Sequence, residues 1–178
     1  EILRLWVAST DYAGELSISD EILKRVVEGY RRIRNTCRFM LGNLYDFDPE
    51  KHRVSYAQMP DMDRYMLHRL QNLVGRCTAA YEKYDYHVVY HSLYNYCTID
   101  LSSVYLDILK DRLYTSPDQS AARRSAQTVM FHTLSALVRI MAPCDTSVGR
   151  FFPAEQAQRH HLIDDAGQLT RGLAALHL

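Results

Sequence analysis

The sequence of 178 residues lacks several features that would direct it to a membrane or to a strongly charged partner. It contains no apolar run that approaches the roughly 20 residues of a membrane-spanning helix, and no signal peptide opens it. Its 21 Lys and Arg residues balance 21 Asp and Glu residues, so the formal net charge is zero. Because there is no global field to collect an anionic partner, any binding of nucleic acid has to come from a local patch.

The spacing of the cysteines excludes two further classes. Cys37, Cys77, Cys97 and Cys144 are far apart in the sequence, which excludes the C-x-x-C pairs of structural zinc sites. The first three fall on apolar helical faces, where cysteine behaves as a small hydrophobe, and nothing indicates a disulfide scaffold. We therefore expect reduced thiols and a cytoplasmic location.

Signatures of catalysis are also missing. There is no glycine-rich phosphate loop, no G-x-S-x-G, no H-E-x-x-H and no E-x-x-H. His87 and His91 stand one helical turn apart and could share a metal ion, but the sequence places no further ligand near them. We expect no metal site and no catalysis by the chain alone, and a free-standing metal enzyme is the least favoured interpretation.

What the sequence does contain is helical periodicity. The longest pattern runs from Ser19 to Phe47, where apolar residues recur every three or four positions along one helical face. Ser19 is predicted to be the N-cap of this helix. Asp20 and Glu21 suit the positive N-terminal end of the helix dipole.

Three further helical runs follow. They span residues 61–85, residues 86–114 with a kink or short break near 98–103, and the residues from 117 to the stop at Pro143. Ser116-Pro117 predicts an N-cap followed by the first helical position of the last run. No alternating strand pattern and no internal repeat is present. The prediction is an all-α fold, an up-down bundle of four to five long helices.

Three phrases of the sequence resemble a known family. They are ILRLWVASTDY near the start, YRRIRNTCRF in the longest helical run and TIDLSSVYLDILKDRLYTS farther along. Together they are similar to the anticodon-binding domain of the class I isoleucyl-tRNA synthetases. The last phrase favours the isoleucine enzymes over their valine and leucine relatives, and the resemblance runs from Glu1 to about Pro143.

The resemblance implies a division of the chain. Residues 1–14 would be the remnant of a linker from a catalytic domain, with Trp6 exposed, and residues 15–143 would be the anticodon-binding helical bundle. We expect the chain to be a piece of a longer protein. Residues 144–178 carry no recognised pattern beyond possible short helices, and a divergent end, a shifted reading frame and a foreign addition all stay open.

The resemblance also implies partners. They are an isoleucine-specific tRNA, whose anticodon stem-loop this domain would hold, and the catalytic domain of the parent chain, with the protein expected to be a monomer. ATP and magnesium would serve the parent's isoleucine–tRNA ligase reaction, and no cofactor is expected in this fragment. The alternative is a helical protein-interaction module without RNA binding, which the zero net charge and the unrecognised tail favour.

Local clusters of basic residues supply the candidates for RNA contact. Between Lys24 and Arg38, six Lys or Arg stand against one acid, Glu28, a local charge of about +5. Arginine forks bind phosphate through two hydrogen bonds. The residues predicted to bind RNA are Arg31, Arg32, Arg38, Lys110, Arg112, Arg123 and Arg124.

Each candidate has a structural alternative. The second basic group, at positions 110–124, could be an ordinary solvated face whose charge Asp107, Asp111 and Asp118 compensate. For Arg34 and Asn35, which lie beside the apolar stripe, we favour a buried polar network with Asp100 over RNA contact. Six tyrosines between positions 81 and 96 could stack bases, but their spacing favours packing.

Overall fold

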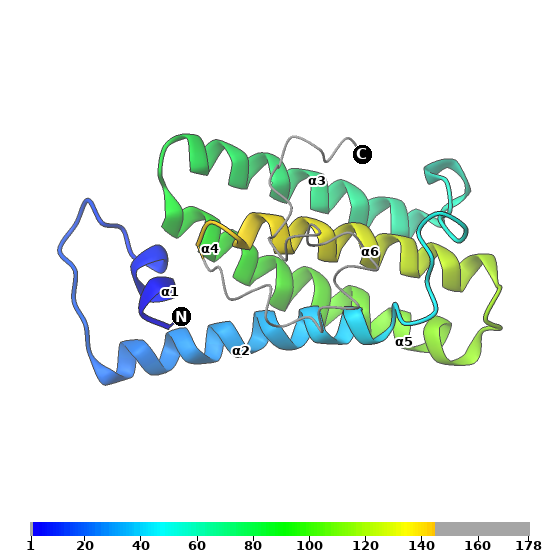
Figure 1. The fold of residues 1–178 in the computed structure, drawn as a ribbon, viewed down its shortest axis with the longest axis horizontal. Helices are drawn as coiled ribbons and strands as arrows, with labels where there is room; N and C mark the ends of the chain where they lie inside the picture. The colour runs from blue at the N-terminus through cyan, green and yellow to red at the C-terminus, as the bar shows by residue number, and fades with distance from the viewer. Residues whose placement is uncertain (1, 145–178) are drawn as a thin grey trace.

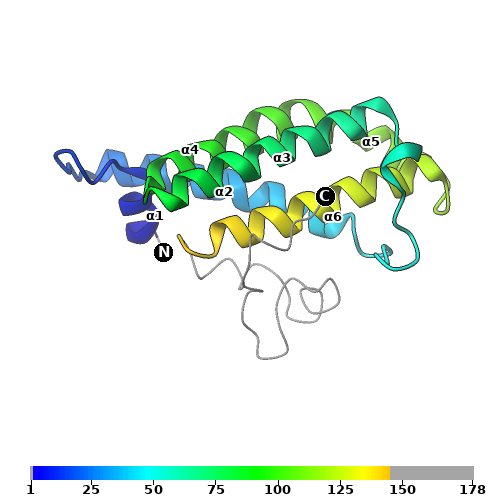
Figure 2. The same cartoon turned by 90° about the horizontal axis from the view of Figure 1, so that it is seen from above.

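The computed structural model describes residues 2–144, and this part of the chain is built from helices and turns with no strand (Figure 1). The elements in chain order are α1 (Ile2–Ser9), α2 (Asp20–Gly42), η1 (Tyr56–Gln58), α3 (Asp61–Glu82), α4 (Tyr86–Asn95), η2 (Tyr96–Tyr105), α5 (Leu106–Thr115) and α6 (Ala121–Met141). The predicted all-α bundle is confirmed. Figures 1 and 2 show the long helices running side by side, with α1 at one end.

The longest predicted helix is confirmed as α2, with a different end. The Ser19 hydroxyl accepts a hydrogen bond from the backbone N–H of Ile22, as its predicted N-cap role requires. The helix ends at Gly42 and not near Phe47. The Asn43 side-chain amide donates to the carbonyl of Phe39, which also accepts from the backbone N–H of Asn43, so this carbonyl at the helix end is satisfied.

The predicted irregularity near residues 98–103 is a π-helical segment, η2, which joins α4 to α5. The wider π turn leaves backbone carbonyls to be satisfied by side chains. The Ser102 hydroxyl donates to the carbonyl of Cys97, and the Ser103 hydroxyl donates to that of Thr98, both over 2.8 Å. The hydroxyl-rich sequence of this segment therefore suits its geometry.

The predicted start of the last helix is wrong. Residues 117–120 form a turn in which the N–H of Ser120 donates to the carbonyl of Pro117. Helix α6 begins at Ala121, and the Ser120 hydroxyl accepts a hydrogen bond from the N–H of Arg123. The cap is therefore Ser120 and not Ser116, because the turn after the proline brings a second serine to the helix start.

The first residues of the chain pack against the bundle, which the sequence did not predict. They form the helix α1, whose Leu5 and Ala8 are buried. Trp6 is half-buried and packs against the main core, so the expectation that it is exposed is wrong. The reason is that α1 lies against α2 and α4, which cover its inner face.

Helix α6 is buried along nearly its whole length, because it packs against α2, α3 and α5. Its first half carries several buried polar side chains, among them Arg123, Arg124 and Ser125, whereas its second half is mostly apolar, with Thr133 and Ser135 as its buried polar residues. Buried polar groups need partners. Ser125 finds one in Asp63 of α3, whose carboxylate is completely buried.

Asp63 joins four helical segments through its two oxygens. Its carboxylate accepts hydrogen bonds from the Tyr105 hydroxyl at 2.9 Å, from Ser125, and from Arg112 in a two-pronged pair at 2.9 and 3.1 Å. Burial raises the pKa of the Tyr105 hydroxyl well above its usual value, so it stays a donor. The carboxylate is thus both neutralised and hydrogen-bonded, as a buried charge requires.

We predict that Asp63→Ala lowers the free energy of unfolding by about 3–5 kcal/mol, because it leaves a buried guanidinium and two hydroxyls without their acceptor. Urea denaturation followed by circular dichroism measures this. The control is Asp61→Ala, two residues earlier on the same helix, whose side chain is 94% exposed. Equal losses in the two variants would contradict the role given to Asp63.

Candidate nucleic-acid interface

The exposed face of α2 is basic. Arg31, Arg32 and Arg38 are all exposed, on the side of the helix away from the buried Ile33 and Cys37. Arg31 pairs with Glu28 at 2.8 Å, but both side chains are more than 60% exposed. Such a surface pair is weak and can give way to a phosphate. The three predicted RNA contacts on this helix are therefore on an accessible face.

A groove of about 410 Å³ runs beside this face, between α2 on one side and η2 with α5 on the other. Arg32 and Asn35 line the α2 wall, and Ser103 and Lys110 line the opposite wall. The Thr36 hydroxyl meets that of Ser102 at 3.1 Å, where the two walls touch. The groove thus has a cation on each wall and polar groups between them.

The sequence phrases that carry the family resemblance meet at this groove. The phrase YRRIRNTCRF, residues 30–39, supplies the α2 wall, and TIDLSSVYLDILKDRLYTS, residues 98–116, forms most of η2 and all of α5. They are about 60 residues apart in the chain. The linear sequence did not predict that these two phrases lie next to each other in the fold.

The predicted buried network of Arg34, Asn35 and Asp100 is wrong. Arg34 and Asn35 are exposed, because the buried stripe of α2 at this level is made by residues 33, 36 and 37. The carboxylate of Asp100 instead accepts hydrogen bonds from Arg69 of α3, at 3.0 and 2.8 Å. Hydrogen bonding to Asp100 raises the pKa of Arg69. Asn35 therefore belongs to the groove wall and not to the core.

The second basic group predicted to bind RNA divides in the structure. Lys110 is exposed at the groove, where it pairs with Asp107 at 2.8 Å. Arg112 is bound to Asp63, and Arg123 and Arg124 are buried. The structure therefore contradicts the expectation of a solvated basic face at these last three residues, and only Lys110 remains a candidate for RNA contact.

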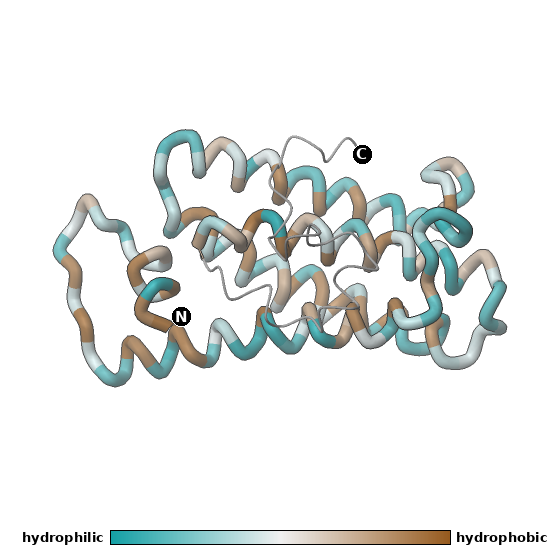
Figure 3. The backbone as a smooth tube through the Cα atoms, in the orientation of Figure 1, coloured by the Kyte–Doolittle hydropathy of each residue, from teal (hydrophilic) through white to brown (hydrophobic). Residues whose placement is uncertain are grey.

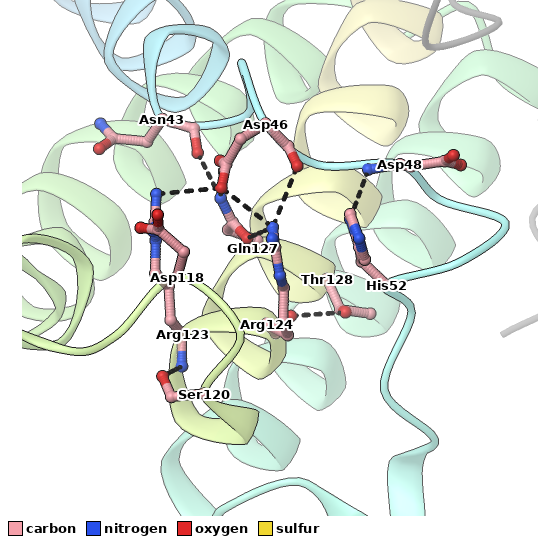
Figure 4. A network of polar contacts seen from close by, with 10 residues as sticks. All are labelled: Asn43, Asp46, Asp48, His52, Asp118, Ser120, Arg123, Arg124, Gln127 and Thr128. Atoms are coloured by element: carbon pink, nitrogen blue, oxygen red, sulfur yellow. Dashed lines mark hydrogen bonds and ion pairs between the residues drawn. The ribbon is translucent and has the colours of Figure 1, made fainter.

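Arg123 and Arg124 hold the segment that follows α2 (Figure 4). Each forms an ion pair with Asp46 at 3.2 Å, and Arg123 also pairs with Asp118. Gln127 donates to Asp46 at 2.7 Å and to the carbonyl of Asn43 at 2.9 Å. We call this set of residues the α6 polar network; it consists of Asn43, Asp46, Arg123, Arg124 and Gln127.

Sequence reasoning missed the α6 polar network. Its one visible signal is that the run RRSAQT, residues 123–128, is polar at every position but Ala126 and yet lies in a helical pattern. A helix that is polar all round is either solvated or supplied with buried partners. The partners come from residues about 80 positions earlier, so the sequence alone could not choose between these two.

Other predicted features lie within the bundle. Tyr90 and Tyr96 are buried, in agreement with packing, whereas Tyr84 is exposed. The four cysteines form no disulfide and are buried, and burial raises the pKa of Cys37 and Cys77 to about 12. Among residues 2–144 no three His, Cys, Asp or Glu side chains are grouped to hold a metal ion. No helix in that range is long and apolar enough to cross a membrane.

Comparison with known proteins gives a consistent result. Residues 63–144 match the family model described as the anticodon-binding domain of tRNA ligase. The isoleucine–tRNA ligase of Symbiobacterium thermophilum is 54% identical over 160 residues, which are 90% of this chain and 16% of the relative. That of Carboxydothermus hydrogenoformans is 52% identical over 160 residues, 90% of the chain and 17% of the relative. That of Desulforamulus reducens is 55% identical over 143 residues, 80% of the chain and 15% of the relative.

The helical fold is thus that of the anticodon-binding domains of tRNA ligases. More particularly, the chain belongs to the isoleucine–tRNA ligase family, and it spans about one sixth of the length of these relatives. Because aligned stretches of 160 residues in a chain of 178 must continue past Pro143, the similarity extends farther than the sequence analysis expected. The predicted division at residues 14 and 143 stays a prediction, and its part at 145–178 lies outside the described residues.

We predict that Arg124→Met lowers the free energy of unfolding by about 2–3 kcal/mol, because it removes an ion pair to Asp46 and a hydrogen bond to Gln127 in a buried place. Thermal and urea denaturation measure this. The matched control is Arg38→Met on the exposed face of α2, for which we expect a change within about 0.5 kcal/mol. A larger loss for Arg38→Met than for Arg124→Met would reverse the roles given to the two arginines.

Proposed function

We propose that this chain holds the anticodon stem-loop of an isoleucine-specific tRNA within an isoleucine–tRNA ligase. The observation that carries the proposal is the groove between α2 and η2–α5, with Arg32 on one wall and Lys110 on the other, and with Arg31 and Arg38 exposed on the same helix. The two sequence phrases that build it are those that resemble the synthetase family. The family model and the relatives support the same function.

The chemistry of the groove suits an RNA loop. Arg32, Arg38 and Lys110 offer cations for phosphates, which fix the register of an RNA without reading its sequence. Asn35 offers both a donor and an acceptor to a base edge. The Ser103 hydroxyl already donates to the carbonyl of Thr98, so its oxygen is left to accept from a ribose 2′-hydroxyl or a base amino group.

In this proposal the task of the chain is positional. The ligase that contains it would activate isoleucine with ATP and magnesium and transfer it to the tRNA. Because the domain holds the other end of the tRNA, it would raise the fraction of encounters in which the acceptor end is correctly placed. ATP and magnesium would act elsewhere in the ligase, and the groove described above has no part in that chemistry.

A second surface fits contact with the rest of the ligase. Around α1 and the segment that follows it, Leu3, Val7 and Tyr12 are about half exposed, at 60%, 49% and 53%. Figure 3 shows the apolar stretches of this end outside the packed bundle. An apolar cavity of about 650 Å³ lies between α1 and the turn that contains Tyr84 and Tyr86. Exposed apolar area of this kind is typical of a face covered by another part of a protein.

The alternative, a protein-interaction module without RNA binding, would use the same apolar end. It would make no demand on the basic face of α2. The two functions are therefore separated by whether that face contributes to binding tRNA.

We predict that Arg32→Ala combined with Arg38→Ala weakens binding of isoleucine tRNA about tenfold or more near 0.1 M salt. The slope of log affinity against log salt should become shallower by about one to two, since each phosphate contact contributes about 0.7–0.9. Fluorescence anisotropy titrations at several salt concentrations measure both quantities, and circular dichroism should show unchanged helicity.

The control is Lys24→Ala combined with Arg25→Ala, which removes the same charge from exposed positions nearer the start of α2. It should change affinity much less. If both double variants weaken tRNA binding equally, the effect comes from the total positive charge and not from contacts of Arg32 and Arg38. If the Arg32/Arg38 variant binds tRNA with unaltered affinity, α2 is not part of the interface. A non-cognate tRNA in parallel shows whether selectivity for isoleucine tRNA lies in this chain.

A further inference from the structure

A second groove, of about 440 Å³, lies on a different pair of helices. It is bounded by the segment of residues 53–59, by α3 and by α6. None of the residues predicted to bind RNA lines it. Its floor is apolar, made by Val54 and by the buried side chains of Met59 and Leu67. An apolar floor with polar groups around it is typical of a site for a small ligand, and a ring can pack on it.

Polar groups that suit the edge of such a ring lie on the groove walls. His132 of α6 is half-buried, and burial, with the positive charge of Arg53, lowers its pKa to about 4. At neutral pH its imidazole therefore offers one donor and one acceptor. Within residues 2–144 no hydrogen bond engages this ring, so both positions are open. Gln71 of α3 adds an amide with the same two capacities.

The mouth of the groove carries one fixed positive charge. Arg53 is exposed, and its guanidinium lies 5.8 Å from the centre of the Phe131 ring, a cation–π distance. Among the described residues, no Asp or Glu lines the groove. Tyr56, which is 58% exposed, adds an aromatic ring at the mouth on which a second base can stack. The groove is therefore complementary to a ring with an anion attached.

The segment that forms the groove is held in place. The N–H of Val54 donates to the Thr128 hydroxyl of α6 at 3.1 Å. The N–H of Asp48 donates to Nδ1 of His52 at 3.0 Å. The α6 polar network also fixes the chain that leads into this segment, at Asn43 and Asp46. A site built this way is preorganised, which lowers the entropy lost when a ligand binds.

We propose that this groove binds an unpaired nucleotide of the tRNA, with its base on the apolar floor against His132 and Gln71 and its phosphate at Arg53. A base alone leaves Arg53 unused, and a phosphate alone leaves the floor and the imidazole unused. A nucleotide engages all three. The proposal rests on the proposed function only in taking the nucleotide to be part of a tRNA, because single-stranded nucleotides are those whose bases can leave the stack.

The test titrates the full 178-residue chain with three probes: the nucleoside 5′-monophosphates, the matching nucleosides and inorganic phosphate. The readout is the NMR signal of the His132 imidazole, assigned by its loss in His132→Phe. We expect at least one monophosphate to shift this signal at millimolar concentration, the nucleoside to bind more weakly, and phosphate alone to leave it in place. A phosphate that competes fully with the nucleotide overturns the proposal, since the groove is then an anion site.

Matched variants separate the groove from general charge. Arg53→Ala should weaken the monophosphate about tenfold and leave the nucleoside unchanged. Lys51→Ala, two residues earlier, removes the same charge from an exposed side chain that pairs with Asp48 and does not line the groove. It should have little effect. Gln71→Leu, at an exposed position, tests the base contact without a buried change, and equal binding by Arg53→Ala, Lys51→Ala and Gln71→Leu overturns the proposal.

The same experiment distinguishes failure of this proposal from failure of the proposed function. The Arg32/Arg38 double variant should lose tRNA affinity and keep mononucleotide binding in the groove. If the chain binds mononucleotides as described but no tRNA, the proposed function fails and the nucleotide site stands. If tRNA binds in a salt-sensitive way and Arg53→Ala changes neither tRNA nor mononucleotide binding, the groove on α3 and α6 is excluded.

Discussion

The structure depends on the partners supplied to the polar first half of α6. This helix is surrounded by other elements, so its buried guanidinium groups would be costly without compensating charge. Asp46, in the segment after α2, supplies that charge to Arg124. Asp63, at the start of α3, accepts a hydrogen bond from Ser125 of α6 and forms an ion pair with Arg112 of α5. Ionic and hydrogen-bonded partners have directional geometry. Apolar packing alone would tolerate sliding of α6 along its neighbours, whereas these contacts fix its register.

The same partners decide which basic residues are left for a ligand. In sequence, Arg112 and Arg124 carry the same signal as Arg32 and Arg38, an arginine in an amphipathic helix, although more acids stand near the first two. The acids that neutralise them are 49 and 78 positions away. Charge counted along a helix therefore overestimates the basic surface. Of the residues predicted to bind RNA, those left accessible lie on α2 and at Lys110, and Arg32 and Lys110 line the two walls of one groove.

Features set by local physics could be predicted from the sequence. The spacing of apolar residues along one helical face predicted α2 and α3. The N-cap at Ser19 could be predicted because it depends only on side-chain chemistry within three residues. Features set by tertiary partners could not. The burial of Trp6, on a helix that packs against α2 and α4, and the partner of Asp100 both depend on which elements meet in space. The groove itself arises where η2, a π-helical segment, passes α2, and no local pattern fixes the separation of the two.

The α6 polar network also links stability to recognition. The segment of residues 43–59 is long for a connection in a helical bundle, and it contains only the short η1 turn. It is held because Asp46, Val54 and their backbone neighbours bond to α6. Without those contacts the segment would lose the fixed geometry of the groove on α3 and α6, although the groove on α2 would keep its walls. The buried arginines therefore act on a ligand only through this segment, whereas the exposed ones act on it directly.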